Sequence, residues 1–181
     1  AALSRRRSPV RTWSGSPHLM DFMKRHFTAT GLIIKNDSVL LHLHPKINLW
    51  LPPGGHVELN EDPVETVKRE VFEETGFTVE IINTSNTNAK IFNNVISIIP
   101  PHTIFIEPIN DVKEGFHEHI DMIYLCEIIE GKLKDDSWRW FNKKEILNHI
   151  DQSYNQSSDI YLTDELIDLC MELFNIIEGR K

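Results

Sequence analysis

The stretch GGHVELNEDPVETVKREVFEETGF, residues 54–77, decides the fold of this chain. Asp62 is a good helix N-cap, and Glu65, three residues later, completes a capping-box pattern. Gly76 is typical of the position just beyond a helix C-terminus. These signals predict a helix over residues 63–75, seven residues after the Pro-Pro-Gly-Gly turn at 52–55.

The predicted helix has one apolar face and one acidic edge. Projected at about 100° per residue, its valines fall on a single face that we expect to be buried: Val64, Val67 and Val71. Three glutamates share an arc beside that face, while Lys68 and Arg69 project elsewhere: Glu70, Glu73 and Glu74. Like charges at these spacings repel one another and destabilise the helix. A bound hard divalent cation such as Mg²⁺ or Mn²⁺ would turn this repulsion into attraction to the ion. The glutamates alone also fit a solvated acidic surface.

The order of the fixed residues in this stretch favours the metal site over a solvated acidic surface. It runs Gly, five residues, Glu, seven residues, Arg-Glu, an aliphatic residue, any residue, Glu-Glu, any residue, Gly and an apolar residue, and it occupies residues 55–77. This pattern resembles the complete Nudix box of the Nudix hydrolase superfamily, and the resemblance extends over about residues 26–150. It implies an α/β fold, an α/β/α sandwich with a mixed sheet. Members of this superfamily hydrolyse nucleoside diphosphates linked to another moiety.

The resemblance also assigns roles to box residues. It implies that Mg²⁺ or Mn²⁺ is held by the carboxylates of Glu70, Glu73 and Glu74 and by the main-chain carbonyl of Gly55. Arg69 is implied to brace the loop by pairing with a box acid, which we expect to be Glu61. We expect Glu73 or Glu70 to take the proton from the attacking water.

Two further glutamates and one histidine outside these positions are candidates for the site. Glu118 and Glu114 could supply a base from outside the box, although each also fits a solvated loop acid. His56 directly follows Gly55 and is therefore placed to contact a substrate phosphate. We expect substrate binding by His56 and Glu118.

Other histidines form two alternating pairs, His42 with His44 and His117 with His119. Alternation places the members of each pair on one face of a strand. Neither pair has a thiolate or a third close ligand in the sequence. We therefore expect surface or partly buried histidines rather than a zinc site, with contacts to substrate as the alternative.

The remaining sequence predicts strands and helices without regular alternation, which favours one mixed α/β domain. Expected strands are 26–35, 38–45, 77–82, 119–129 and 138–141, the first two joined by a hairpin at Asn36-Asp37. Expected helices are 143–150, capped by Asn142 with Glu145, and 164–178, capped by Thr163.

Residues 1–20 differ in composition from the rest of the chain. They contain four arginines and no acid, whereas all the acidic residues lie beyond them. A segment added for expression and an Arg- and Ser-rich transit peptide both fit this pattern. We expect residues 1–20 to lie outside the fold and residues 21–181 to form a single domain.

Bulk properties restrict the partners of this protein. The net charge of −8 disfavours binding to nucleic acid, and no apolar run is long enough for a membrane span. Cys126 and Cys170 lie in apolar surroundings without metal-ligand spacing, which indicates core thiols in a reducing, cytoplasmic setting. A small nucleotide-type molecule is the expected partner, and the sequence leaves a homodimer open.

We therefore expect a Mg²⁺-dependent hydrolase that cleaves a diphosphate linkage by attack of water at phosphorus. Nucleoside triphosphates, ADP-ribose and related compounds all remain candidate substrates. Two alternatives stay open: a Nudix module that binds a nucleotide without cleaving it, and a diphosphate isomerase that uses a catalytic cysteine.

Overall fold

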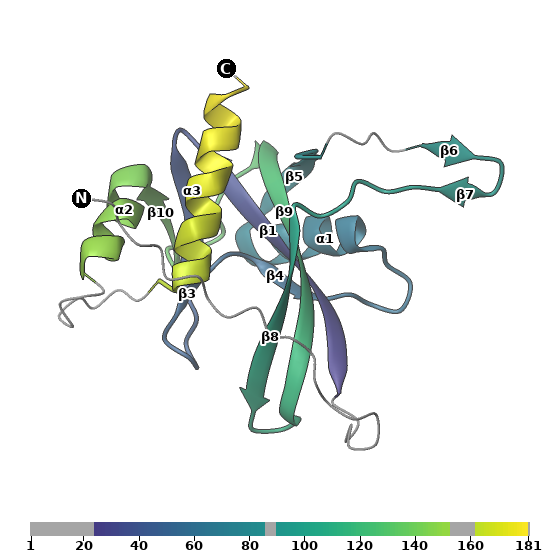
Figure 1. Cartoon of the computed structure of the whole chain (residues 1–181), viewed down its shortest axis with the longest axis horizontal. Coiled ribbons are helices and arrows are strands. Elements are labelled where there is room, and N and C mark those ends of the chain that lie inside the picture. Colours follow the sequence, from purple (N-terminus) through teal and green to yellow (C-terminus); the bar gives the residue numbers. More distant parts are fainter. Residues whose placement is uncertain (1–23, 86–89, 153–161, 181) are drawn as a thin grey trace, which may run out of the picture.

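The computed structural model describes residues 24–85, 90–152 and 162–180. Its centre is a mixed sheet in which the strands follow the order β10-β2-β1-β9-β5 (Figure 1). These central strands are β1 (Arg25–Lys35), β2 (Ser38–Leu43), β5 (Phe77–Ile82), β9 (Gly115–Gly131) and β10 (Trp138–Asn142). Only β1 and β9 are parallel among the paired strands of this sheet.

Shorter or outer strands extend this sheet. Strand β3 (Trp50–Leu51) pairs with β2, β4 (Gly54–His56) pairs with β1, and β8 (Thr103–Asp111) pairs with β9. Strands β6 (Ile91–Phe92) and β7 (Val95–Ile96) form a separate two-stranded arm that projects from the domain (Figure 1).

Helices cover both faces of the sheet. On one face, α1 (Pro63–Thr75) packs Val67 and Val71 against Ile33 of β1. On the other, α2 (Lys143–Gln152) and α3 (Asp164–Glu178) pack against residues that include Leu32 and Leu125. Adjacent residues of β1 therefore contribute to opposite cores, as strand alternation requires. This arrangement confirms the predicted α/β/α sandwich with a mixed sheet.

Capping groups fix α1 where the sequence predicted it. The Asp62 carboxylate accepts hydrogen bonds from the main-chain N–H groups of Val64 (2.8 Å) and Glu65 (3.0 Å). In return, the Glu65 carboxylate accepts from the N–H of Asp62 (2.9 Å). The helix stops at Gly76, whose φ of 82° lies in the left-handed region that favours glycine.

Other local predictions are confirmed as well. Asn36 and Asp37 have φ values of 49° and 57°, which suit the tight turn of the β1–β2 hairpin. Asn142 and Glu145 form the expected capping box at the start of α2.

Strand β9 is longer than predicted, because it continues through residues 115–118 to pair with the outer strand β8. Pro108 is tolerated in β8 because that strand has a single partner.

The predicted leader, residues 1–20, lies outside the described residues. Within the described part of the chain, no helix is long and apolar enough to cross a membrane.

Candidate active site

Strand β4 and helix α1 bring Gly55 and Glu70 into direct contact. Gly55 lies opposite Ala29 of β1, on the face that α1 covers. A Cβ atom added at Gly55 would lie only 2.2 Å from Oε1 of Glu70. The Glu70 carboxylate therefore packs against the main chain of Gly55, and a larger residue at position 55 would displace it.

Arg69 links three of the box acids. Its Nε and Nη2 donate to Glu61 at 2.6 and 2.9 Å, a bidentate pair. Its Nη1 donates to Glu70 (2.7 Å) and to Glu73 (3.3 Å), and Nη2 also reaches the main-chain carbonyl of His56 (3.2 Å). The expected pairing with Glu61 is thus present. The expectation that Arg69 projects away from the glutamates is wrong, because its long side chain folds back over them.

These contacts shift the pKa values of both partners. Hydrogen bonds from Arg69 lower the pKa of Glu61 to about 2, aided by the Thr66 hydroxyl at 2.9 Å. The same bonds raise the pKa of Arg69 above its ordinary value. Glu61 is therefore ionised at neutral pH and keeps the guanidinium in place over the loop.

Glu74 occupies a different environment from its neighbours on the helix. Its carboxylate is half-buried and accepts a hydrogen bond from the main-chain N–H of Gly54 at 3.2 Å. Burial raises the pKa of Glu74 to about 7, and the charges of Glu70 and Glu73 add to this effect. A cation beside this carboxylate would favour its ionised form.

The oxygen atoms of the box suit a hard cation. Glu70 is largely buried, with a side chain 16% exposed, whereas the Glu73 side chain is 58% exposed and open to water. Together with Glu74 and the main chain of Gly55, they offer only oxygen donors, which fits Mg²⁺ or Mn²⁺ better than softer metals.

The structure places Glu118 and Glu114 in ion pairs near the start of β9. Glu118 accepts from Nε of Arg25 at 2.8 Å, and Glu114 accepts from Lys24 at 2.6 Å. Strand alternation puts Glu118 on the face that carries α1, whereas His117 and His119 point to the other face.

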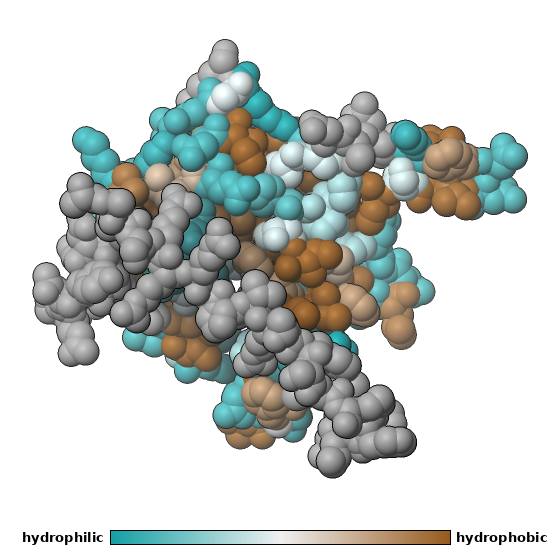
Figure 2. Space-filling view, viewed as in Figure 1, coloured by the Kyte–Doolittle hydropathy of each residue, from teal (hydrophilic) through white to brown (hydrophobic). Residues whose placement is uncertain are grey.

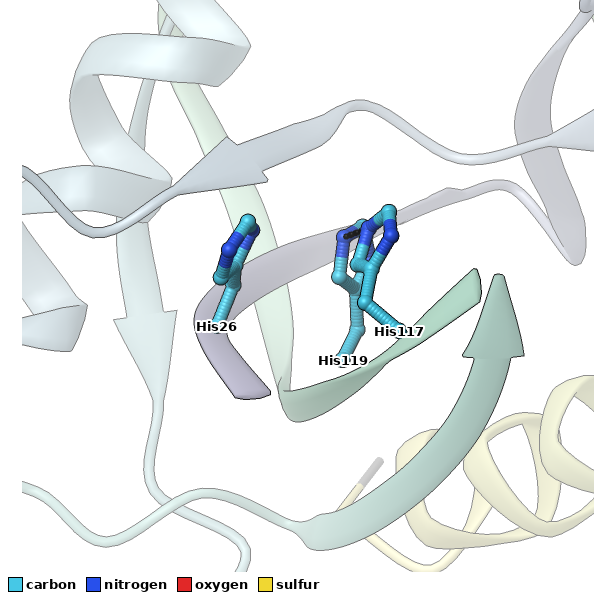
Figure 3. A group of neighbouring side chains, drawn as sticks. All are labelled: His26, His117 and His119. Atoms are coloured by element: carbon cyan, nitrogen blue, oxygen red, sulfur yellow. Dashed lines mark hydrogen bonds between the residues drawn. The ribbon is translucent and has the colours of Figure 1, made fainter. Parts of the chain in front are cut away.

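A histidine cluster lies on that other face, at the start of β1 and β9. His26 of β1 faces His117 and His119 of β9 (Figure 3). Nδ1 of His26 lies 3.0 Å from Nε2 of His56, and Nε2 of His117 lies 3.2 Å from Nε2 of His119. The expectation that the pair at 117 and 119 lacks a third close ligand is therefore wrong. His26 was missed because it is distant in sequence and joins the cluster only through the parallel pairing of β1 with β9.

Burial depresses the basicity of two of these rings. It lowers the pKa of His119 to about 4, helped by the charges of the neighbouring histidines. Burial also lowers the pKa of His26, together with the nearby Lys24. Both rings are therefore neutral at physiological pH, and each then carries one nitrogen with a free lone pair.

Two acids on the same face, the buried Asp121 and the partly buried Glu107, were also missed by sequence reasoning. The Asp121 carboxylate accepts hydrogen bonds from the Thr28 and Thr30 hydroxyls, each at 2.8 Å, and burial raises its pKa. Burial also raises the pKa of Glu107 to about 7. Both lie in strand-like apolar runs, where the sequence gives no sign that an acid faces inward.

Fold and site together define a class: an α/β/α domain in which carboxylates of one helix lie against a Gly-Gly turn that precedes it. The model of the NUDIX domain matches residues 24–162, and the chain belongs to this family. The solved structure of a NUDIX-family hydrolase from Clostridium perfringens is 27% identical, with a TM-score of 0.64. That match covers 86% of this chain and 99% of the other.

Two curated relatives are similar over a shorter region. A protein named "Probable DHNTP pyrophosphohydrolase" from Lactococcus lactis subsp. cremoris (strain MG1363) is 36% identical over 104 residues, which are 57% of this chain and 54% of that protein. A "MutT-like protein" from Streptomyces ambofaciens is 32% identical over 73 residues, 40% of this chain and 47% of that protein. The matches thus span about half the length of these relatives.

Proposed function

We propose that this protein is a Mg²⁺-dependent pyrophosphohydrolase that cleaves a diphosphate linkage in a nucleotide-type substrate by attack of water at phosphorus. The observation that carries this proposal is the contact between Glu70 and the main chain of Gly55. This contact and the hydrogen bond from the N–H of Gly54 to Glu74 bring carboxylate oxygens of α1 close to the Gly-Gly turn that precedes the helix.

Each box residue then has a distinct role. Glu70, Glu73, Glu74 and the Gly55 carbonyl hold Mg²⁺ or Mn²⁺, which when bound neutralises phosphate charge and activates water. Glu73 takes the proton of the attacking water, because its side chain is the most exposed of the three. Arg69 keeps Glu70 and Glu73 in position through its bond to Glu61.

Residues outside the box complete the site. We do not assign phosphate binding to the His56 ring, because strand alternation turns it to the face opposite α1, where its Nε2 lies 3.0 Å from Nδ1 of His26. Glu118 is the alternative base, because it lies on the face of the sheet that carries α1. The ion pair with Arg25 keeps its carboxylate in a defined place.

We propose a nucleoside triphosphate or a close analogue as the substrate, with release of pyrophosphate. The name of the Lactococcus lactis relative, a pyrophosphohydrolase, supports this choice. ADP-ribose is the second candidate that the family resemblance leaves open.

A substrate panel tests the proposed activity. Release of pyrophosphate and phosphate should be measured for nucleoside triphosphates and ADP-ribose, with Mg²⁺ and with excess chelator. We expect turnover only with metal and a loss of orders of magnitude in Glu73→Gln. Turnover that survives excess chelator would contradict the metal-dependent mechanism.

The two alternative functions are less well supported. A non-catalytic nucleotide-binding module has no need of a complete set of box acids, and here all of them are present. A diphosphate isomerase would need a reactive cysteine at its site. Cys126 is fully buried in the core beside α1, and burial raises the pKa of its thiol.

We also propose a homodimer formed through the β6–β7 arm. Brown, hydrophobic atoms gather on the projecting arm in Figure 2, behind its teal tip. Four large apolar side chains of the arm are exposed: Ile91, Phe92, Val95 and Ile96. Clustered apolar surface of this kind is typical of contact sites. Light scattering on the wild type and on Ile91→Ser/Ile96→Ser tests this; a monomeric wild type would exclude the dimer.

We propose a cytoplasmic location. Both Cys126 and Cys170 are free and buried, as expected for core thiols in a reducing compartment.

A further inference from the structure

We propose that His26, His117 and His119 bind a transition-metal ion of the Zn²⁺ class, at a site separate from the box carboxylates. One nitrogen from each ring lies within 4.8 Å of the corresponding nitrogens of the other two. No other group of three or more such ligand atoms is this compact within residues 24–85, 90–152 and 162–180. The cluster does not depend on the proposed hydrolysis.

The orientation of His117 favours metal binding. Its Nδ1 lies 3.0 Å from the main-chain carbonyl of Gly115. A carbonyl can only accept, so Nδ1 carries the proton and Nε2 presents its lone pair to the cluster. A metal-binding histidine usually has its other ring nitrogen fixed by such a bond. His117 is also buried, with 3% of its surface exposed, and its Nε2 faces Nε2 of His119 rather than bulk water.

The spacing of the nitrogens agrees with shared coordination. Nε2 of His117 and Nε2 of His119 lie 3.2 Å apart. Two nitrogens bound to one tetrahedral zinc at about 2.0–2.1 Å are separated by about 3.3–3.4 Å. His26 completes a set of three across the gap (Figure 3), which leaves a fourth position for water or an anion, as in open zinc sites.

The chemistry and place of this cluster distinguish it from the box. Imidazole nitrogens suit Zn²⁺, Co²⁺ and Ni²⁺, whereas Mg²⁺ prefers oxygen ligands. His56 lies opposite Thr28 in the sheet, and Gly55 lies opposite Ala29. These adjacent residues therefore face opposite sides, with Gly55 toward α1 and the His56 ring toward the histidine cluster.

His56 acts as a positioning residue for this site. Its Nε2 lies 3.0 Å from Nδ1 of His26, and this bond holds the His26 ring. Loss of such a supporting contact typically lowers metal affinity by about 10–100-fold rather than abolishing binding.

Metal titration of the full chain, prepared without a polyhistidine tag, tests the site. Co²⁺ alone should give the visible absorption of a tetrahedral nitrogen site at one ion per chain, and Zn²⁺ should displace it. We expect His119→Gln and His26→Gln to lower Zn²⁺ affinity by at least about 100-fold and His56→Gln to lower it by about 10–100-fold. Circular dichroism checks that each variant is folded. The buried His117 is left unchanged, because its substitution carries the greatest risk to the fold.

Two controls separate this site from the rest of the protein. His42→Gln changes a histidine of β2 whose ring centroid lies 6.0 Å from that of His44, just beyond the strand, and it should leave Zn²⁺ binding unchanged. Glu73→Gln should weaken Mg²⁺ binding and leave the Co²⁺ absorption intact. The proposal is overturned if the wild type shows no tetrahedral Co²⁺ absorption, or if that absorption survives in both His26→Gln and His119→Gln.

Discussion

Arg69 is the residue on which the geometry of the box most depends. It is the common partner of Glu61, Glu70 and Glu73, and it also contacts the main chain of His56. Without a positive charge at this point, three carboxylates would face one another on a short segment. The guanidinium fork suits this task because it can bond two acids in fixed directions.

Arg69→Lys should therefore destabilise the protein although it keeps the charge. Lysine cannot form the bidentate bond to Glu61, so we expect the free energy of unfolding to fall by about 1–3 kcal/mol. Urea denaturation at neutral pH measures this change. Arg139→Lys is the matched control, since Arg139 pairs with Glu145 on the surface, and it should cost no more than about 0.5 kcal/mol. Equal effects of the two substitutions would contradict a special role for Arg69.

Glu107 gives a prediction about pH. Its pKa in the folded protein is about 7, above the ordinary value of 4.5, because of burial and the charges of Asp121 and Glu165. Between these pH values the folded protein holds a proton that the unfolded chain has lost. The free energy of unfolding therefore falls as pH rises from about 4.5 to about 7 on account of this group.

Glu107→Gln should remove this contribution. The pKa change sets an upper limit of about 3 kcal/mol, and partial exposure of the side chain reduces the expected effect to about 1 kcal/mol. The variant should thus be more stable than the wild type at pH 8 and equally stable at pH 4. Chemical denaturation at both pH values measures this, with the exposed Glu130→Gln as a control. An equal gain at both pH values would exclude the titration of Glu107 as its cause.

At the scale of elements, the contact between β1 and α1 fixes the position of the box helix. Gly31 of β1 lies directly beneath that helix. A Cβ at this position would lie 2.9 Å from methyl groups of both Val67 and Val71 and 3.1 Å from Sγ of Cys126. Glycine is therefore required here by close packing of the helix against the strand.

Gly31→Ala should push α1 away from the sheet and lower the free energy of unfolding by about 1–3 kcal/mol. Gly179→Ala is the matched control, because Gly179 has a φ of −71° and its Cβ would meet only ordinary contacts of 3.5 Å or more. Urea denaturation compares the two variants. If Gly31→Ala is as stable as Gly179→Ala, the contact between α1 and β1 has room for a methyl group at position 31, which would contradict the close packing described here.

At the scale of the whole molecule, local signals in the sequence predicted local structure well. The capping box of α1, the Asn36-Asp37 turn and the cap at Asn142 each involve residues within four positions of one another. Their geometry depends on backbone conformation and short-range hydrogen bonds, which the residue types themselves determine. The Nudix box belongs to the same category, because it is contained in one continuous stretch.

Long-range pairing could not be predicted in the same way. His26 meets His119 only because β1 and β9 pair in parallel. The two residues are 93 positions apart in the sequence, and nothing near either one signals that register. The inward orientation of Asp121 and Glu107 likewise depends on which face of β9 and β8 the core selects. The reach of Arg69 was misjudged because a helical projection places Cβ atoms and ignores the length of the side chain.

The central claim is that the box glutamates form a site for Mg²⁺, and Glu74→Gln tests it with little risk to the fold. Glutamine keeps an oxygen that can accept the hydrogen bond of Gly54, and in the metal-free protein it removes a half-buried charge from beside Glu70 and Glu73. Glu80→Gln is the control, because Glu80 is exposed and pairs with Lys68.

The decisive measurement is the rise in melting temperature on addition of saturating Mg²⁺ at pH 8. This rise reports metal that binds the folded state in preference to the unfolded chain. We predict a clear rise for the wild type and for Glu80→Gln, and a much smaller rise for Glu74→Gln, whose melting temperature without metal is unchanged or higher. A Mg²⁺-dependent rise in Glu74→Gln equal to that of the wild type would contradict the assignment of the box as the metal site.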